Sequence, residues 1–262
     1  MEYTSARVHV ASPEDMPILA AAIGESPETV ISHHLLTSRA CNAWYVGDVR
    51  QPRGLIVQAH AFPAEPNIHG FDAEDIAGII PYVDEWDTFC TPLHLVEGIE
   101  RAVTAARDTT SLRTVTDIYH VLDSPIVDIP THPQVRLLTD DDAMLTMMID
   151  ELQQTSAYKP IVAGAVSDGE IVSLAHTFAW SPLYVDIGVT THEQFRGQGM
   201  ATAAAAIVAT EVQKRGKIPV WSTGAHNEPS LRIAARLGFR ETSRRLYLIP
   251  VEEQLVPMTH EH

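Results

Sequence analysis

The sequence VDIGVTTHEQFRGQGMA, residues 185–201, is the most informative stretch of this chain. Its apolar start, 185–189, predicts a strand, and the alanine-rich run that begins at Met200 predicts a helix. Gly197 and Gly199 lie between them, where glycine lets the backbone adopt positive φ values and approach a ligand closely. The first turn of the helix would present unpaired N–H groups toward this loop, which is an arrangement that binds phosphate.

The residues around this loop argue against two other glycine-rich phosphate loops. A dinucleotide-binding fingerprint has a third glycine where this chain has Thr202, and an acidic residue at the end of the next strand, which 218–223 lacks. A nucleotide P-loop continues with Gly-Lys-Ser/Thr, and no such sequence follows Gly199. We therefore expect a different phosphate-bearing ligand.

Charge is distributed unevenly along this acidic chain. The 262 residues include 34 acidic and 18 basic side chains, a net charge of −16, which argues against nucleic acid as a partner. Residues 196–245 reverse the balance, with nine basic and three acidic side chains, a net of +6. This basic region indicates either a local anionic ligand or a set of solvated helix faces and caps.

Composition restricts the class of protein. About 45% of residues are hydrophobic, which is ordinary for a folded globular protein, and the length suits one large or two small domains. Cys41 and Cys90 are the only cysteines, which favours a reducing compartment, so we expect a cytoplasmic protein. Neither a secretory leader nor a membrane span of ~20 apolar residues is present, so we expect no membrane partner. Cysteine, histidine and carboxylate residues lack ligand spacing, so we expect no metal.

Both halves of the chain follow a similar predicted order of helices, a strand hairpin and further strands. The segment 124–133 between them holds three prolines, so we predict a linker, with one α/β domain at 1–130 and a second at 131–262. The repeated order indicates either a degenerate internal duplication or the rhythm common to mixed α/β domains. The expected helices are 12–22, 26–38, 71–83, 92–106, 139–154, 200–215 and 228–237, and the expected strands are 43–49, 54–62, 86–91, 114–122, 134–138, 161–166, 171–179, 183–189, 218–223 and 240–249.

Two motifs in the second half resemble those of the GNAT superfamily of N-acetyltransferases. The loop from Gln194 to Gly199 is similar to that family's pyrophosphate loop, Gln/Arg-x-x-Gly-x-Gly/Ala, at every defined position. Downstream, Asn227 starts a predicted helix that ends in Leu-Gly-Phe at 237–239, as the family's second motif does. The resemblance implies an α/β fold with a mixed sheet, a GNAT-like domain in the second half and, on one interpretation, a degenerate tandem copy in the first.

The resemblance also implies which residues hold acetyl-CoA as the co-substrate. In the family, the fourth and fifth strands separate, and the pantetheine arm lies between them. By this resemblance, the residues expected to bind acyl-CoA come from the fourth strand, the loop and the second motif: Ile187, Gly188, Val189, Gln194, Phe195, Arg196, Gly197, Gln198, Gly199, Met200, Ala201, Asn227 and Ser230. The first half offers one glycine and no basic residue in His69-Gly-Phe-Asp72, so we expect that it has lost acyl-CoA binding.

Catalytic roles follow from the same resemblance, with one departure. Asp186, on the fourth strand, is the first candidate for the base that takes a proton from the attacking amine; the alternative is a surface carboxylate. Many family members carry a tyrosine acid seven residues after the motif's Asn, but this chain has Ala234 there. Either Ser230 replaces it as a catalytic residue, the thiolate leaves without an acid, or catalysis is lost.

The expected activity is transfer of an acetyl group from acetyl-CoA to the amine of a small molecule, by direct attack with both substrates bound. Two alternatives stay open: an acyl-CoA-binding module without turnover, and an acetyltransferase acting on protein lysines or N-termini. A monomer and a homodimer are equally compatible with the sequence. The family usually has another strand after the one expected at 240–249, so we expect the first half to complete that sheet.

Overall fold

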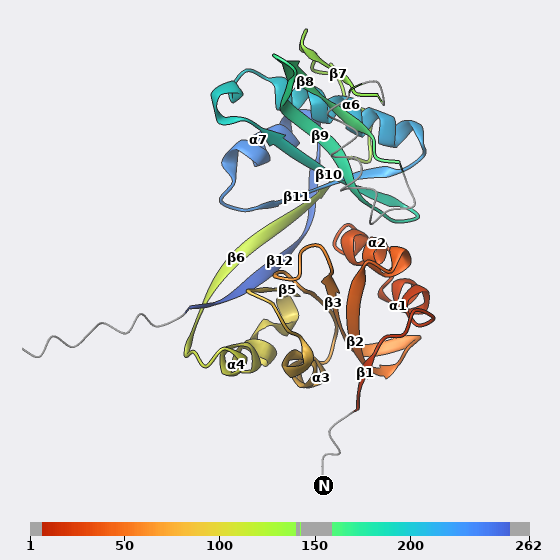
Figure 1. The fold of residues 1–262 in the computed structure, drawn as a ribbon, viewed down its shortest axis with the longest axis vertical. Helices are drawn as coiled ribbons and strands as arrows, with labels where there is room; N and C mark the ends of the chain where they lie inside the picture. Colours follow the sequence, from red (N-terminus) through yellow and green to blue (C-terminus); the bar gives the residue numbers. More distant parts are fainter. Residues whose placement is uncertain (1–6, 140–141, 143–158, 252–262) are drawn as a thin grey trace, which may run out of the picture.

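The computed structural model describes residues 7–139, 142 and 159–251, which form two lobes joined by two long strands (Figure 1). One mixed sheet of twelve strands runs through both lobes, in the order β1-β2-β3-β4-β5-β12-β6-β11-β10-β9-β8-β7. The chain is therefore a mixed α/β protein, as expected. No helix within the described ranges combines the length and the apolar character needed to cross a membrane.

The first half of the chain builds the lower lobe of Figure 1 and one of the connecting strands. Two short strands, β1 and β4, were not expected, and each has four residues or fewer. The elements are β1 (Val8–Val10), α1 (Met16–Ile23), α2 (Val30–Ser38), β2 (Cys41–Asp48), β3 (Gln51–Ala59), β4 (Asn67–Gly70), α3 (Ala73–Ile79), β5 (Phe89–Pro92), α4 (Val96–Ala106) and β6 (Ser111–Val121), with single 3₁₀ turns at Ile80–Tyr82 and Leu93–Leu95.

The second half builds the upper lobe and the other connecting strand. Most of the helix expected at 139–154 lies outside the described residues; the strands and the other two helices are present close to their expected bounds. The elements are β7 (Val135–Leu137), β8 (Val162–Ser167), β9 (Glu170–Trp180), β10 (Tyr184–Thr191), a 3₁₀ turn at Glu193–Phe195, α6 (Met200–Lys214), β11 (Ile218–Gly224), α7 (Glu228–Leu237) and β12 (Arg240–Val251).

Each half gives one strand to the sheet of the other. Strand β6, from the first half, lies between β11 and β12 and pairs antiparallel with both. Strand β12, from the second half, also pairs with β5. The expectation that the first half completes the second sheet is confirmed. A domain boundary near residue 130 falls between β6 and β7 and stays a prediction.

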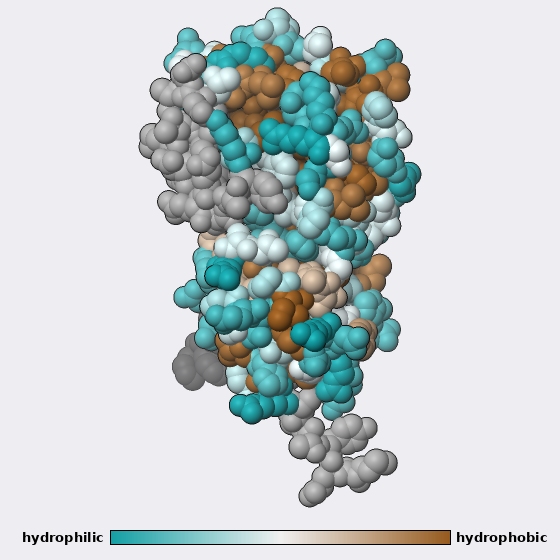
Figure 2. All heavy atoms as spheres, turned by 90° about the vertical axis from the view of Figure 1, so that its right-hand side faces the viewer, coloured by the Kyte–Doolittle hydropathy of each residue, from teal (hydrophilic) through white to brown (hydrophobic). Residues whose placement is uncertain are grey.

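Helices cover the upper part of the sheet from both sides. On one face, the alanines of α6 pack against Ile187 and Trp221, and α7 adds Leu237. On the other face, Val30 of α2 packs against Ala179 and neighbouring residues of the central strands. A helix of the first half thus covers a sheet built mainly by the second. Figure 2 shows polar side chains spread over both lobes, with several apolar groups on the upper lobe.

Candidate active site

Strands β10 and β11 separate partway along their length. They pair in parallel only from Tyr184 to Asp186, whose partner is Val220. Beyond this point β10 continues beside β9, and β11 continues beside β6. The pairing of β10 with β9 also shifts register between Asp186 and Ile187. Among the described residues, no strand pairs with the edge of 187–189 that faces β11, so its backbone groups can pair with an extended ligand as another strand would.

Asp186 and Ile187 lie on opposite faces at the point of separation. Ile187 is 4% exposed and packs against α6, whereas Asp186 belongs to the face that α2 covers. The carboxyl of Asp186 is only 5% exposed, so the alternative of a surface carboxylate is wrong. Among the described residues, its Oδ1 has no hydrogen-bond partner.

The surroundings of Asp186 favour its protonated form. Burial, together with the negative charge of Asp117, raises the pKa of Asp186 to about 7, against a hydrogen bond from Ser222 that lowers it. Asp117 lies on β6 and is itself buried, which raises its pKa to about 6. A carboxyl whose pKa is near neutral pH is suited to act as a general base.

Asp117 was not among the residues expected in this site. It comes from the first half of the chain and reaches the site because β6 inserts beside β11. No local motif marks it, since its partner Asp186 is far away in the sequence and only the exchanged strand brings the two together.

The loop after β10 has the backbone conformation expected of a phosphate cradle. Gly197 and Gly199 have φ values of +76° and +83°, and nothing lies within 4 Å of the position that a Cβ would take at either residue. Gly199 caps α6, whose first bond from this end is the N–H of Ala203 donating to the Gly199 carbonyl, 3.1 Å. The N–H groups that precede it are left for a ligand.

Arg196 and Gln198 brace this loop. The Nε of Arg196 donates to the carbonyl of Thr191, 3.3 Å, and the amide of Gln198 donates to the carbonyl of Gln194, 3.4 Å. Both side chains are exposed, and Arg196 adds a positive charge four residues before the first residue of α6. The local charge, the glycines and the helix N-terminus together fit a pyrophosphate group.

Helix α7 closes the other side of the separation. The side chain of Asn227 caps it by accepting the N–H of Ser230, 3.3 Å, and the Ser230 hydroxyl accepts a hydrogen bond from Trp221, 3.0 Å. Ala234 is buried, 1% exposed, and because alanine has no hydroxyl this position supplies no acid. The nearest tyrosine in the sequence that could supply an acid, Tyr247, pairs in register with Cys90 of β5, so it lies on the side of the lower lobe and not at α7.

The match to a known family covers β9, β10, β11, the loop at 194–199, α6 and α7, but not α2 or β6. Residues 157–245 match the family model for GNAT acetyltransferases. This segment is a GNAT acetyltransferase domain. This match supports acyl-CoA-dependent acyl transfer as the general activity of the matched segment. The comparison of the chain with curated proteins found no match.

Several solved structures share the fold over nearly the whole chain. A GCN5-related N-acetyltransferase-like protein from Streptococcus suis is 19% identical, with a TM-score of 0.63 over 92% of this chain and 100% of that one. A GCN5-related N-acetyltransferase from Sphaerobacter thermophilus is 14% identical, with a TM-score of 0.60 over 94% and 96%. A tandem GNAT protein from the clavulanic acid biosynthesis pathway is 14% identical, with a TM-score of 0.56 over 95% and 100%. The first half therefore has a GNAT-like fold too.

The first half also contains a pair of parallel strands that corresponds to β10 and β11, and the side chain of Arg245 bridges this pair. Strands β4 and β5 are its parallel pair, and they share only one register position, Asn67 with Cys90. The Nη2 of Arg245, 1% exposed, donates to the carbonyls of Ile68 on β4 and Cys90 on β5, at 2.5 and 2.9 Å. The space where a pantetheine arm would enter is thus occupied by a side chain from β12.

We therefore expect one acetyl-CoA per chain, although the GNAT fold occurs twice. The second-half loop keeps its glycines, whereas the first-half strands are bridged by Arg245. Calorimetric titration of acetyl-CoA into the protein should give a stoichiometry near one. A stoichiometry near two would contradict the closure of the first-half strands.

Within the described ranges, no three His, Cys or carboxylate side chains gather where they could hold a metal ion.

Proposed function

We propose that the protein transfers an acetyl group from acetyl-CoA to the amine of a small molecule, with both substrates bound together. The observation that carries the proposal is the separation of β10 from β11 directly beside the buried carboxyl of Asp186. The same strand leads into the loop at 194–199, so a phosphate cradle and a candidate base belong to one continuous segment. Binding both substrates in one cleft supplies much of the acceleration of such a reaction.

The residues present fit acetyl-CoA. The loop N–H groups from 195 to 201 and the charge of Arg196 would hold the pyrophosphate, and the free edge of 187–189 would pair with the pantetheine arm. When bound, acetyl-CoA supplies a reactive thioester. Free N–H groups on the same edge of β10 can donate to the acyl carbonyl oxygen, which stabilises negative charge that develops there.

Asp186 is the proposed base. An amine must lose its proton to become a nucleophile, and the unpartnered Oδ1 of Asp186 can accept that proton directly or through a water. Burial, together with the charge of the Asp117 carboxyl, keeps Asp186 from ionising until the pH approaches neutrality. We assign Asp117 a positioning and tuning role.

The proposed acid is Ser230, or none. Its hydroxyl accepts from Trp221, which leaves its own O–H free to donate toward a departing thiolate. A thiolate with an intrinsic pKa of ~8.5 also leaves without an acid more readily than an alkoxide would. Buried Ala234 is the observation that favours the alternative function, acyl-CoA binding without turnover.

A small acceptor is favoured over a protein. Helix α2 packs on the face of the sheet that carries Asp186, with Val30 against Ala179 and Val220, and this narrows the approach. The two buried carboxyls of Asp186 and Asp117 would attract a cationic amine before it loses its proton.

The test is thiol release from acetyl-CoA, followed over many turnovers with a panel of small primary amines. We expect sustained release with at least one amine and the acetylated amine as a product by mass spectrometry. Binding of acetyl-CoA without release would favour the binding module. Acetylation confined to lysines or N-termini of added proteins would replace the small amine with a protein acceptor.

A further inference from the structure

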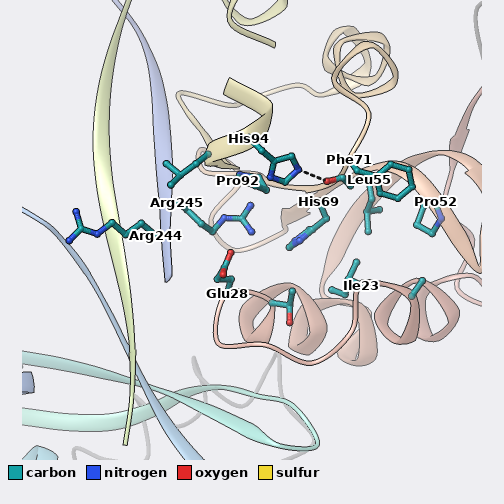
Figure 3. Close-up of a pocket in the computed structure, with 14 residues that line it drawn as sticks. Ile23, Glu28, Pro52, Leu55, His69, Phe71, Pro92, His94, Arg244 and Arg245 are labelled. Atoms are coloured by element: carbon teal, nitrogen blue, oxygen red, sulfur yellow. Dashed lines mark hydrogen bonds between the residues drawn. The ribbon is translucent and has the colours of Figure 1, made fainter. Parts of the chain in front are cut away.

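A cavity of about 580 Å³ lies in the lower lobe, on the other side of α2 from the upper lobe (Figure 3). Its volume is typical of small-molecule sites. It is formed where the loop between α1 and α2 meets the ends of β4 and β5 and strand β12. It is therefore the space next to the first-half strands that Arg245 bridges.

The inner end of this lower-lobe cavity carries a buried positive charge with a free donor. Arg245 is 1% exposed and lines the cavity. Its Nη2 is used by two backbone carbonyls, but among the described residues its Nε has no hydrogen-bond partner. A buried guanidinium is costly unless its donors are satisfied, so a ligand oxygen at Nε would be favoured.

Glu28 supplies a negative charge on the same part of the wall. Its carboxylate points toward the Arg245 guanidinium in Figure 3 and is close enough to favour the charged guanidinium. Glu28 is half-buried and precedes α2, so its oxygens face the cavity from the opposite side to β12.

Other titratable groups lie near this pair. Asp117 of β6 pairs in register with Arg245, whose charge acts to lower the pKa of the Asp117 carboxyl, and the buried Cys90 and Tyr119 also lie near the guanidinium. Burial and the nearby Arg245 charge hold the pKa of His69 well below its ordinary value, and its Nε2 hydrogen-bonds the Ser32 hydroxyl, 2.8 Å. His94 donates from Nε2 to the carbonyl of Gly70, 3.3 Å (Figure 3). Arg244 points away and pairs with Glu241, 2.7 Å.

Much of the remaining wall is apolar, although Thr29, His69 and His94 also line the cavity. Ile23 and Leu55 line the cavity from α1 and β3, and Phe71 stands at its rim with 71% of its surface exposed. Prolines and a leucine at the end of β5 and on β3 complete this part: Pro52, Pro92 and Leu93. The cavity thus combines the Glu28 carboxylate, the buried Arg245 guanidinium and a largely apolar side.

We propose that this lower-lobe cavity binds a zwitterionic α-amino acid with an apolar side chain. Its carboxylate would accept from Nε of Arg245, its ammonium would donate to Glu28, and its side chain would lie against Ile23, Leu55 and Phe71. A ligand with a carboxylate alone would face the negative charge of Glu28, and one with an amine alone would leave the Arg245 donor unsatisfied. Asp186 does not line this cavity and the proposal does not depend on acyl transfer, although Arg245 pairs in register with Asp117, the neighbour of Asp186.

The test is calorimetric titration without acetyl-CoA, using leucine and phenylalanine as probes. Leucine is compared with 4-methylpentanoate, which lacks the amine, and with 3-methylbutylamine, which lacks the carboxylate. We expect an amino acid to bind and each leucine analogue to bind at least about tenfold more weakly than leucine. Failure of both amino acids to bind, or equal affinity for leucine and either analogue, would overturn the proposal.

Variants separate the site from general folding. Glu28→Gln should weaken leucine binding at least about tenfold while leaving 4-methylpentanoate binding unchanged or tighter, because it removes the opposing charge. Arg245→Met should abolish leucine binding, whereas Arg244→Met, the neighbour that points away, should leave it intact. Retained acetyl-CoA binding reports folding of each variant. Unchanged leucine affinity in folded Glu28→Gln would contradict the assignment.

Discussion

Replacing Gly199 with aspartate is expected to abolish acetyl-CoA binding while leaving the protein folded. Gly199 has a φ of +83° and begins α6, and its missing Cβ faces open space where the phosphates would lie. An aspartate there tolerates the left-handed conformation but places a negative charge against them and covers the helix N–H groups. If wild-type binding is micromolar, about −8 kcal/mol, calorimetry should show a loss of at least about 100-fold, or ~3 kcal/mol.

Gly169→Asp is the matched control for this variant. Gly169 lies in the turn between β8 and β9, has a φ of +84° and likewise has open space at its Cβ position, but it is not part of the loop at 194–199. The same substitution there should carry a similar backbone cost without changing acetyl-CoA affinity. If both variants bind as the wild type does, the loop is not the phosphate site.

Local features of this fold could be predicted because short-range chemistry determines them. Helix α7 occupies the expected residues, since Asn227 caps its start and Gly238, with a φ of +88°, ends it. The strand, loop and helix around Gly199 were likewise expected from glycine placement and apolar runs. Strands β1 and β4 could not be predicted because they are too short to show an alternation of apolar and polar residues. Strand β4 forms through its pairing with β3 and β5.

Features that depend on the exchange of strands could not be predicted in detail. Nothing in the sequence around Asp117 indicates that β6 will lie beside β11, so its effect on Asp186 was missed. Arg245 looks like one more charge in a basic region, yet it is buried and bridges β4 and β5. Its role depends on the pairing of β12 with β5, which joins residues more than 150 positions apart.

Asp186→Asn is expected to lower kcat/KM for the amine by about 10²- to 10⁴-fold, the range for loss of a general base. The base must be deprotonated, and burial with Asp117 raises the pKa of Asp186 to about 7, so wild-type activity should rise as the pH passes through about 7. The variant should lose this rise. Steady-state rates from pH 5 to 9 measure both effects, and a variant with unchanged rates would exclude Asp186 as the base.

Two companion variants sharpen this test. Burial is the larger cause of the raised pKa of Asp186, and Asp117→Asn removes the second cause, the Asp117 charge, so the rise in activity should move to lower pH while the maximal rate changes little. Asp123→Asn removes an exposed carboxylate that pairs with Arg240, 2.7 Å, and should leave the pH profile as it is. If the pH dependence of the rate is the same in Asp117→Asn as in the wild type, the rise in activity with pH does not reflect the ionisation of Asp186.

Stability distinguishes the loss of a base from a loss of folding. In the unfolded chain Asp186 has a pKa of ~3.9, whereas in the folded protein it is about 7, so the folded state binds the extra proton between these values. The carboxyl therefore makes the protein progressively less stable as the pH rises from about 4 to about 7, and the penalty is fully present above that, at up to ~4 kcal/mol. An asparagine does not ionise, so Asp186→Asn avoids this loss of stability, and its Tm relative to the wild type should be higher at pH 8 than at pH 5. A variant that is inactive yet gains relative stability with rising pH has lost a proton acceptor; one that melts early at both pH values would not support the assignment.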